Sequence, residues 1–110
     1  MDTIKAIDAF AALAHDTRLE VLRLLIRRGT DGMAAGDIAA TLDIRQNTMS
    51  ANLAVLTRAG LIRAERDGRS IRYAADMEGL RGLLGYMMED CCGGRPELCQ
   101  PVLDELVCDC

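Results

Sequence analysis

The chain has 110 residues, enough for one domain with a single hydrophobic core. Half of its residues are hydrophobic and 27% are charged, which is ordinary for a soluble globular protein. The sequence contains no apolar run of about eighteen residues, the length that a membrane span requires. Its first residues, Met1–Lys5, do not have the pattern of a secretory signal. We therefore expect a cytoplasmic protein with no membrane partner.

The net charge of −4 does not exclude nucleic acid as a partner, because the charges are unevenly distributed. Residues 1–75 hold eleven Lys and Arg against nine Asp and Glu, whereas residues 76–110 hold two against eight. Within residues 45–75, six arginines face two acidic residues. Local patches, and not totals, determine where a polyanion docks.

In chain order, helical spacing of apolar residues predicts a first helix over Thr3–Leu13. A second helix is expected over Thr17–Arg28, with Asp16 as its N-cap and Gly29 at its end.

Two further helices, Ala35–Leu42 and Gln46–Ala59, flank the three-residue turn 43–45. Two short helices joined in this way are typical of a helix-turn-helix motif.

The spacing then changes to a period of two over Leu61–Arg66 and Ser70–Ala74. The Asp67-Gly68-Arg69 segment between them predicts a β-hairpin turn. A last long helix is expected over Met77–Asp90, followed by a short amphipathic piece at Val102–Val107.

Together these elements predict a mainly α-helical fold with a small β-hairpin, the arrangement called a winged helix-turn-helix. Residues 1–90 would form the winged-helix DNA-binding and dimerisation domain, and residues 91–110 a cysteine-rich, metalloid-binding tail. The apolar stripes on the first and last helices exceed what one small protomer covers, so we expect a homodimer.

The start of the helix at Gln46 is rich in short amide and hydroxyl side chains. Such side chains also occur as ordinary surface and capping residues, but here they follow a helix-turn and precede a basic hairpin. We therefore predict contacts to double-stranded operator DNA in the major groove. The candidate residues are Gln46, Asn47, Thr48, Ser50 and Asn52 on the helix, with Arg66 and Arg69 on the hairpin. Arg63 and Arg72 fit a phosphate contact and a solubilising role equally well.

All five cysteines lie between Cys91 and Cys110. In the reducing cytosol such a cluster indicates metal binding or redox chemistry and not a disulfide framework. Cys91 and Cys92 are adjacent, and the glycines after them allow Cys99 to join the pair on one ion. Three thiolates suit the pyramidal coordination of As(III) or Sb(III), whereas adjacent cysteines are unusual in a tetrahedral zinc site. The roles of Cys108 and Cys110 stay open.

The segments Gly36–Ala39, Gln46–Leu53 and Arg66–Arg69 resemble the ArsR/SmtB family of metal-sensing repressors. This resemblance covers about residues 5–90 and implies a homodimer that leaves its operator when an effector binds. The residues Ala34–Asp37 lack the cysteines of one arsenic-sensing branch, and Met77–Asp90 lacks the histidines of the zinc sensors. What remains is similar to the branch with a C-terminal vicinal cysteine pair and a third cysteine, which responds to As(III) and Sb(III).

We therefore expect a repressor of an arsenic-resistance operon, with As(III) or Sb(III) as inducer and no catalytic cofactor. An enzyme is not expected, since a thiol enzyme such as an arsenate reductase needs a basic, anion-cradling loop that 91–99 lacks. Two alternatives remain: a winged-helix thiol redox sensor, and a sensor of methylarsenite that uses only Cys91 and Cys92.

Overall fold

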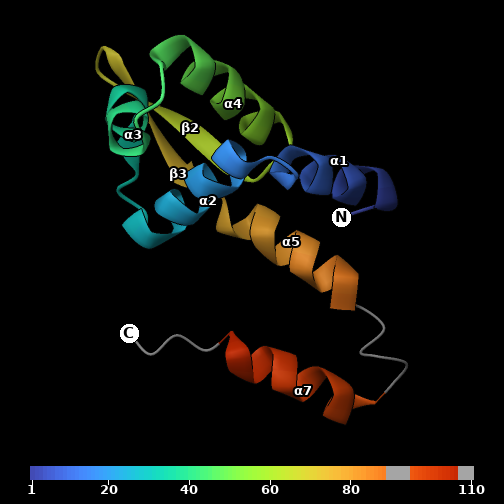
Figure 1. The fold of residues 1–110 in the computed structure, drawn as a ribbon. Coiled ribbons are helices and arrows are strands. Elements are labelled where there is room, and N and C mark those ends of the chain that lie inside the picture. Colours follow the sequence, from blue (N-terminus) through green and yellow to red (C-terminus); the bar gives the residue numbers. More distant parts are fainter. Residues whose placement is uncertain (89–94, 107–110) are drawn as a thin grey trace.

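The computed structural model describes residues 1–88 and 95–106 of the chain. In these ranges six helices and a three-stranded sheet account for most of the residues, and the strand β1 is only two residues long (Figure 1). The helices are α1 (Thr3–Leu13), α2 (Asp16–Arg28), α3 (Ala35–Leu42), α4 (Gln46–Arg58), α5 (Met77–Met88) and α7 (Pro96–Glu105). The strands are β1 (Met33–Ala34), β2 (Ile62–Asp67) and β3 (Ser70–Ala75).

The N-terminal helices begin at side-chain caps. The Asp2 carboxylate accepts the Lys5 N–H at the start of α1 (2.8 Å), and the His15 ring accepts the Thr17 N–H at the start of α2 (3.2 Å). The predicted N-cap at Asp16 was therefore wrong by one residue, since Asp16 is the first residue of α2 and His15 is the cap. The Asp16 carboxylate also accepts the Thr17 N–H, so both side chains satisfy the helix start.

The helix-turn-helix is formed by α3 and α4, as predicted. Between them Asp43 adopts the left-handed conformation (φ 54°), and the Ile44 N–H donates to the Ala39 carbonyl at 2.9 Å. This C-terminal cap ends α3 and turns the chain into α4. Ile38 and Ala39 on α3 are buried, so the two helices pack closely.

The sheet has the strand order β1-β3-β2 and is antiparallel throughout. Asp67 pairs with Ser70, which leaves the two-residue turn Gly68-Arg69 and not the three-residue turn expected from the sequence. Gly68 has a positive φ of 65°, as the first turn position of a tight hairpin requires. The strand β1, which was not predicted, pairs Met33 with Tyr73 and extends the hairpin into a sheet.

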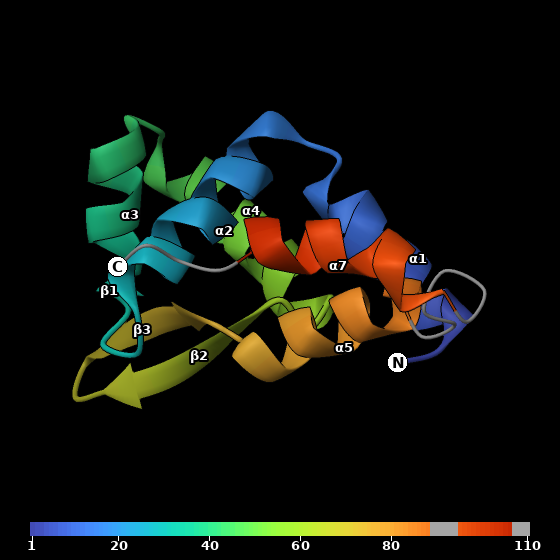
Figure 2. The same ribbon diagram turned by 90° about the horizontal axis from the view of Figure 1, so that it is seen from below.

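The core lies between the sheet and the helices α1 to α5, and aliphatic side chains and methionines fill it. The most deeply buried large side chains are Leu25, Ile38, Met49, Leu53, Leu56, Leu61, Ile62 and Val21. Figure 2 shows the hairpin at one end of the molecule and α1 at the other, with α2 and α4 between them. The core therefore fixes the orientation of α4 relative to the hairpin.

The C-terminal helix differs from the sequence prediction. Residues 102–105 of the predicted piece Val102–Val107 belong to the longer helix α7, which begins at Pro96, includes Cys99 and Pro101 and ends at Glu105; Val107 lies outside the described residues. Proline is favourable at the first position of a helix, where its missing N–H costs nothing. The end of the last predicted long helix, at Asp90, lies outside the described residues, and α5 is described to Met88. None of the described helices is long and apolar enough to cross a membrane.

Gly79 allows α5 to approach the turn before β2, and we expect Gly79→Ala to destabilise the fold. An added Cβ would lie 1.8 Å from the Gly60 carbonyl oxygen, a backbone atom that cannot move aside cheaply. We expect a loss of about 2 kcal/mol or more in the free energy of unfolding, measured by urea denaturation. Gly82→Ala is the matched control, because its Cβ would meet only Met1 at ordinary contact distance. Equal stability of the two variants would contradict this packing.

Candidate nucleic-acid interface

The start of α4 presents a row of exposed polar side chains. Met49, Leu53 and Leu56 are fully buried and anchor the opposite face of the helix in the core. The predicted DNA-contacting side chains that lie exposed are Gln46, Asn47, Thr48 and Ser50. Their amide and hydroxyl groups, together with the N–H groups of the helix start, are suited to base edges and phosphates.

Asn52 differs from the other predicted residues on α4. Its side chain is only 7% exposed, and its amide group donates to the Thr48 carbonyl (3.2 Å). Its side-chain oxygen accepts a hydrogen bond from the Arg18 guanidinium (3.3 Å). A side chain held in this way is not displayed to DNA with Gln46 and Ser50, so we assign Asn52 a positioning role.

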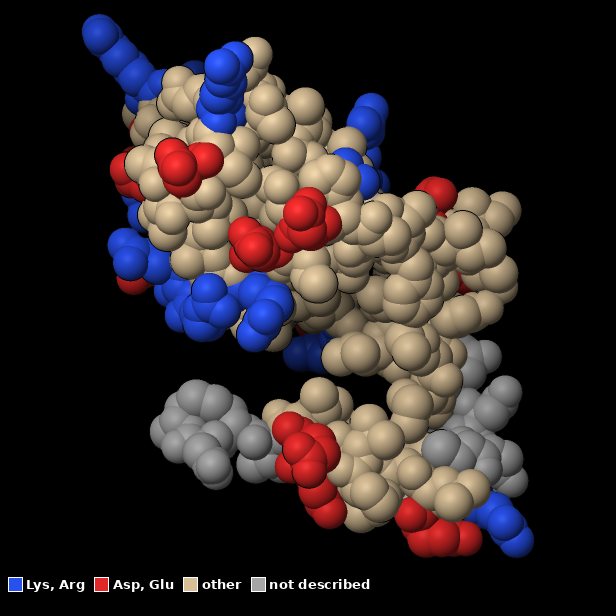
Figure 3. Space-filling model, viewed as in Figure 1, with Lys and Arg blue, Asp and Glu red and all other residues tan. Residues whose placement is uncertain are grey.

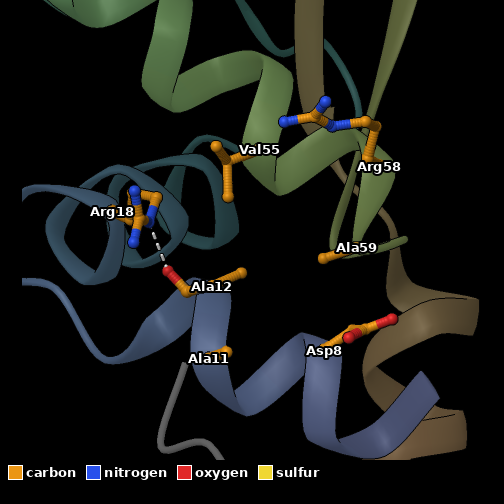
Figure 4. Close-up of a pocket in the computed structure, with 7 residues that line it drawn as sticks. All are labelled: Asp8, Ala11, Ala12, Arg18, Val55, Arg58 and Ala59. Carbon is orange, nitrogen blue, oxygen red and sulfur yellow. Dashed lines mark hydrogen bonds between the residues drawn. The ribbon is translucent and has the colours of Figure 1, made fainter. Parts of the chain in front are cut away.

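Arg18 joins three helices at this point. From α2 its guanidinium donates to the Ala12 carbonyl at the end of α1 (2.6 Å) and to Asn52 on α4. Figure 4 shows Arg18 at one side of a hollow of about 440 Å³ between these helices, with Arg58 and Asp8 at the other side. Sequence reasoning did not identify Arg18. The burial of its partner Asn52 can be predicted from the sequence, because Asn52 has the same helical spacing as Met49 and Leu56.

Asn52→Ala is expected to destabilise the fold, because it removes an acceptor from a half-buried guanidinium. The expected loss is about 1–2 kcal/mol in the free energy of unfolding, measured by urea denaturation. Ser50→Ala, two residues away but exposed, serves as the control and should change stability by less than about 0.5 kcal/mol. If Asn52→Ala were as stable as Ser50→Ala, the Arg18–Asn52 hydrogen bond would not support the position of α4.

The hairpin arginines fall into two groups. Arg63 pairs with Glu65 (3.5 Å), and the Arg72 guanidinium donates to the Asp31 and Gly32 carbonyls (3.0 Å each), which holds the segment before β1. Arg66 and Arg69 are exposed, and within residues 1–88 and 95–106 neither forms an ion pair. In Figure 3 cationic side chains project from the end of the molecule that carries the hairpin and α4. Arg66 and Arg69 are therefore the hairpin residues available to a polyanion.

Arg66→Ala and Arg69→Ala are each expected to weaken DNA binding about equally for all DNA sequences. Each guanidinium that leaves a phosphate should lower the slope of log K against log salt by about 1. The measurement is the affinity for one duplex at several salt concentrations. Lys5→Ala is the control, since α1 lies at the far end of the molecule from the hairpin (Figure 2). Unchanged slopes in both arginine variants would contradict a phosphate contact by the hairpin.

The predicted thiol site is only partly described. Cys99 lies on α7 and is 5% exposed, whereas Cys91 and Cys92 lie outside the described residues. Within 1–88 and 95–106, no three His, Cys, Asp or Glu side chains come together as metal ligands. Of the three cysteines proposed from the sequence as ligands, only Cys99 therefore lies in the described part of the chain.

The fold and the exposed start of α4 define a winged-helix DNA-binding protein. A family model described as a helix-turn-helix domain matches residues 13–65. The HTH-type transcriptional regulator YbzH of Bacillus subtilis is 32% identical over 76% of this chain and 96% of its own length. The chain belongs to the helix-turn-helix transcriptional regulators, and the relatives it matches are regulators and not enzymes. It is similar to winged-helix regulators of the ArsR family.

Solved structures support the same fold. An ArsR-like transcriptional regulator of Rhodococcus superposes with a TM-score of 0.69 at 24% identity, over 97% of this chain and 96% of its own. The homodimeric winged helix-turn-helix domain of a possible ArsR-family regulator from Mycobacterium bovis superposes with a TM-score of 0.63 at 29% identity, over 83% of this chain and 84% of its own. A protein of Halobacterium salinarum assigned as an arsenical resistance operon repressor is 35% identical, over 71% of this chain and 64% of its own.

Proposed function

We propose that this protein is a homodimeric repressor of an arsenic-resistance operon, which leaves its operator when As(III) or Sb(III) binds Cys91, Cys92 and Cys99. The observation that carries the DNA-binding part is the exposed polar row at the start of α4, held by a buried apolar face. Gln46, Asn47, Thr48 and Ser50 would contact base edges and phosphates, while Arg66 and Arg69 contact the backbone.

The dimer is supported by apolar side chains that one protomer leaves in water. Ile4, Ile7 and Phe10 on α1 are 73%, 60% and 44% exposed, and Met77, Leu84 and Met87 on α5 are about half exposed. Contiguous apolar surface of this kind is typical of an interface. A two-fold dimer would place two α4 helices about one DNA turn apart, on an inverted repeat.

The effector assignment is supported by the chemistry of the cysteines and by the relatives. Three thiolates are the donor set that a soft, three-coordinate ion prefers, and the cytosol keeps such thiols reduced. One relative is assigned as an arsenical resistance operon repressor. Cys91 and Cys92 follow α5 in the chain and Cys99 lies on α7, so an ion held by all three would link α7 to the end of α5. Such a link couples effector and DNA binding through the dimer.

The test begins with selection of binding sites from a pool of random duplexes. The expected product is an inverted repeat with half-sites about 10 base pairs apart. Adding As(III) under reducing conditions should then release the protein, whereas peroxide should not. Selected sites without two-fold symmetry would contradict the dimer on DNA. Release by peroxide with no bound arsenic would instead favour the thiol redox sensor.

A further inference from the structure

An apolar groove separates α7 from α5. It has a volume of about 510 Å³, and its lining includes Leu80, Leu84 and Met88 from α5 and Val102, Leu103 and Leu106 from α7. Among the described residues that line it, Arg81 alone is charged, and it pairs with Glu78 on its own helix. Figure 3 shows α7 standing off from the body of the molecule across this hollow. The protomer alone leaves two facing apolar helix surfaces in water.

The helix α1 of the same protomer does not fill the groove. It packs on α5 elsewhere, where the Thr3 hydroxyl and the Tyr86 hydroxyl form a hydrogen bond of 2.5 Å. Its buried side is the alanine row Ala6, Ala9 and Ala12. The row Ile4, Ile7 and Phe10 therefore has no partner within the described protomer, although each of the three side chains is large and apolar.

We propose that the groove between α5 and α7 receives the Ile4–Ile7–Phe10 row of a second copy of this chain, so that α7 clamps the partner's α1. This proposal rests on the homodimer proposed above and adds α7 to its interface. The three helices match in length, because 10 to 12 residues give about 15–18 Å each. The row and the lining are both almost free of charge, as a buried contact between helices requires. The groove is also continuous with the exposed apolar face of α5.

The clamp brings the proposed effector site to the dimer interface. Cys99 precedes Val102, Leu103 and Leu106 by three, four and seven residues, which is the spacing of one helix face. The thiol thus lies on the same side of α7 as the groove lining. An ion held by Cys99 would act on the helix face that holds the partner.

The test uses the native full-length dimer in a mixed-label NMR experiment. One copy carries labelled isoleucine methyl groups and the other labelled leucine and valine methyl groups. We expect intermolecular contacts from Ile4 and Ile7 to Val102, Leu103 and Leu106. A dimer with contacts between α1 and α5 but none to α7 would overturn this inference and leave the homodimer standing. A chain that sediments as a monomer would overturn both.

A substitution tests the same contact by sedimentation equilibrium. Leu103 is 48% exposed in the protomer, so Leu103→Gln should fold normally. We expect it to raise the dimer dissociation constant at least about tenfold. Glu105→Gln, on the same helix but outside the groove lining, should change it less than about twofold. Equal dissociation constants for the two variants would overturn the clamp.

Discussion

Replacing Cys91, Cys92 and Cys99 together by serine is expected to leave operator binding intact and to abolish release by arsenite. A serine hydroxyl is a poor ligand for a soft ion, and the cysteines lie far along the chain from α4. Effector coupling is typically worth about 5- to 150-fold in affinity, and the variant should lose all of it. The measurement is operator affinity with and without As(III).

Two further variants control this experiment. Because Cys99 is buried, serine there buries an additional polar hydroxyl, so Cys99→Ala should be compared with it. Both versions should lose the response to arsenite with unchanged operator affinity. The double variant Cys108→Ser and Cys110→Ser should keep the response, since three sulfurs satisfy the ion. Full release of the triple variant by arsenite would show that the effector site lies elsewhere.

The double variant Gln46→Ala and Ser50→Ala should lose most of its specific DNA affinity without losing stability. The two side chains are one helical turn apart and exposed. A lost base contact costs about 1–3 kcal/mol, so two of them should lower operator affinity by about thirtyfold or more. Since neither side chain packs in the core, the free energy of unfolding should change by less than about 0.5 kcal/mol.

Fluorescence anisotropy with the selected operator and with a random duplex measures this effect. The loss should be confined to the operator, because binding to a random duplex depends on phosphate contacts. Gln100→Ala is the control, because it removes an exposed polar side chain from α7, away from α4 (Figure 1). Equal losses on both duplexes would mean that Gln46 and Ser50 do not read bases.

The helix-turn-helix and the hairpin could be predicted because their signals are local. Helical spacing located α3 and α4, and the Asp67-Gly68 pair located the hairpin. The strand β1 could not be found in this way, since two residues carry no period and Met33 is a strand residue only through its pairing with Tyr73. The start of α7 could not be found in this way, since the amphipathic spacing was recognised only from Val102 onward, whereas the helix begins at Pro96.

In the candidate site, too, some features follow from local sequence spacing and others depend on tertiary packing. The exposed positions of Gln46, Asn47, Thr48 and Ser50 follow from the apolar spacing of the opposite face of α4. The buried position of Asn52 follows from that same spacing, although an amide side chain at the start of such a helix is also typical of a base contact. Its bond to Arg18 joins positions 34 residues apart and depends on how α2 packs against α4. Contacts of this kind require the tertiary structure.

We propose that a trivalent metalloid bound by C-terminal thiolates releases this regulator from DNA. The most direct test is fluorescence anisotropy of the preformed operator complex, titrated separately with As(III), Sb(III), Zn(II) and peroxide under defined redox conditions. We predict a fall in anisotropy with As(III) or Sb(III), at about one ion per protomer, and no change with Zn(II) or peroxide. An operator complex that stays intact with stoichiometric As(III) and Sb(III) would contradict the claim.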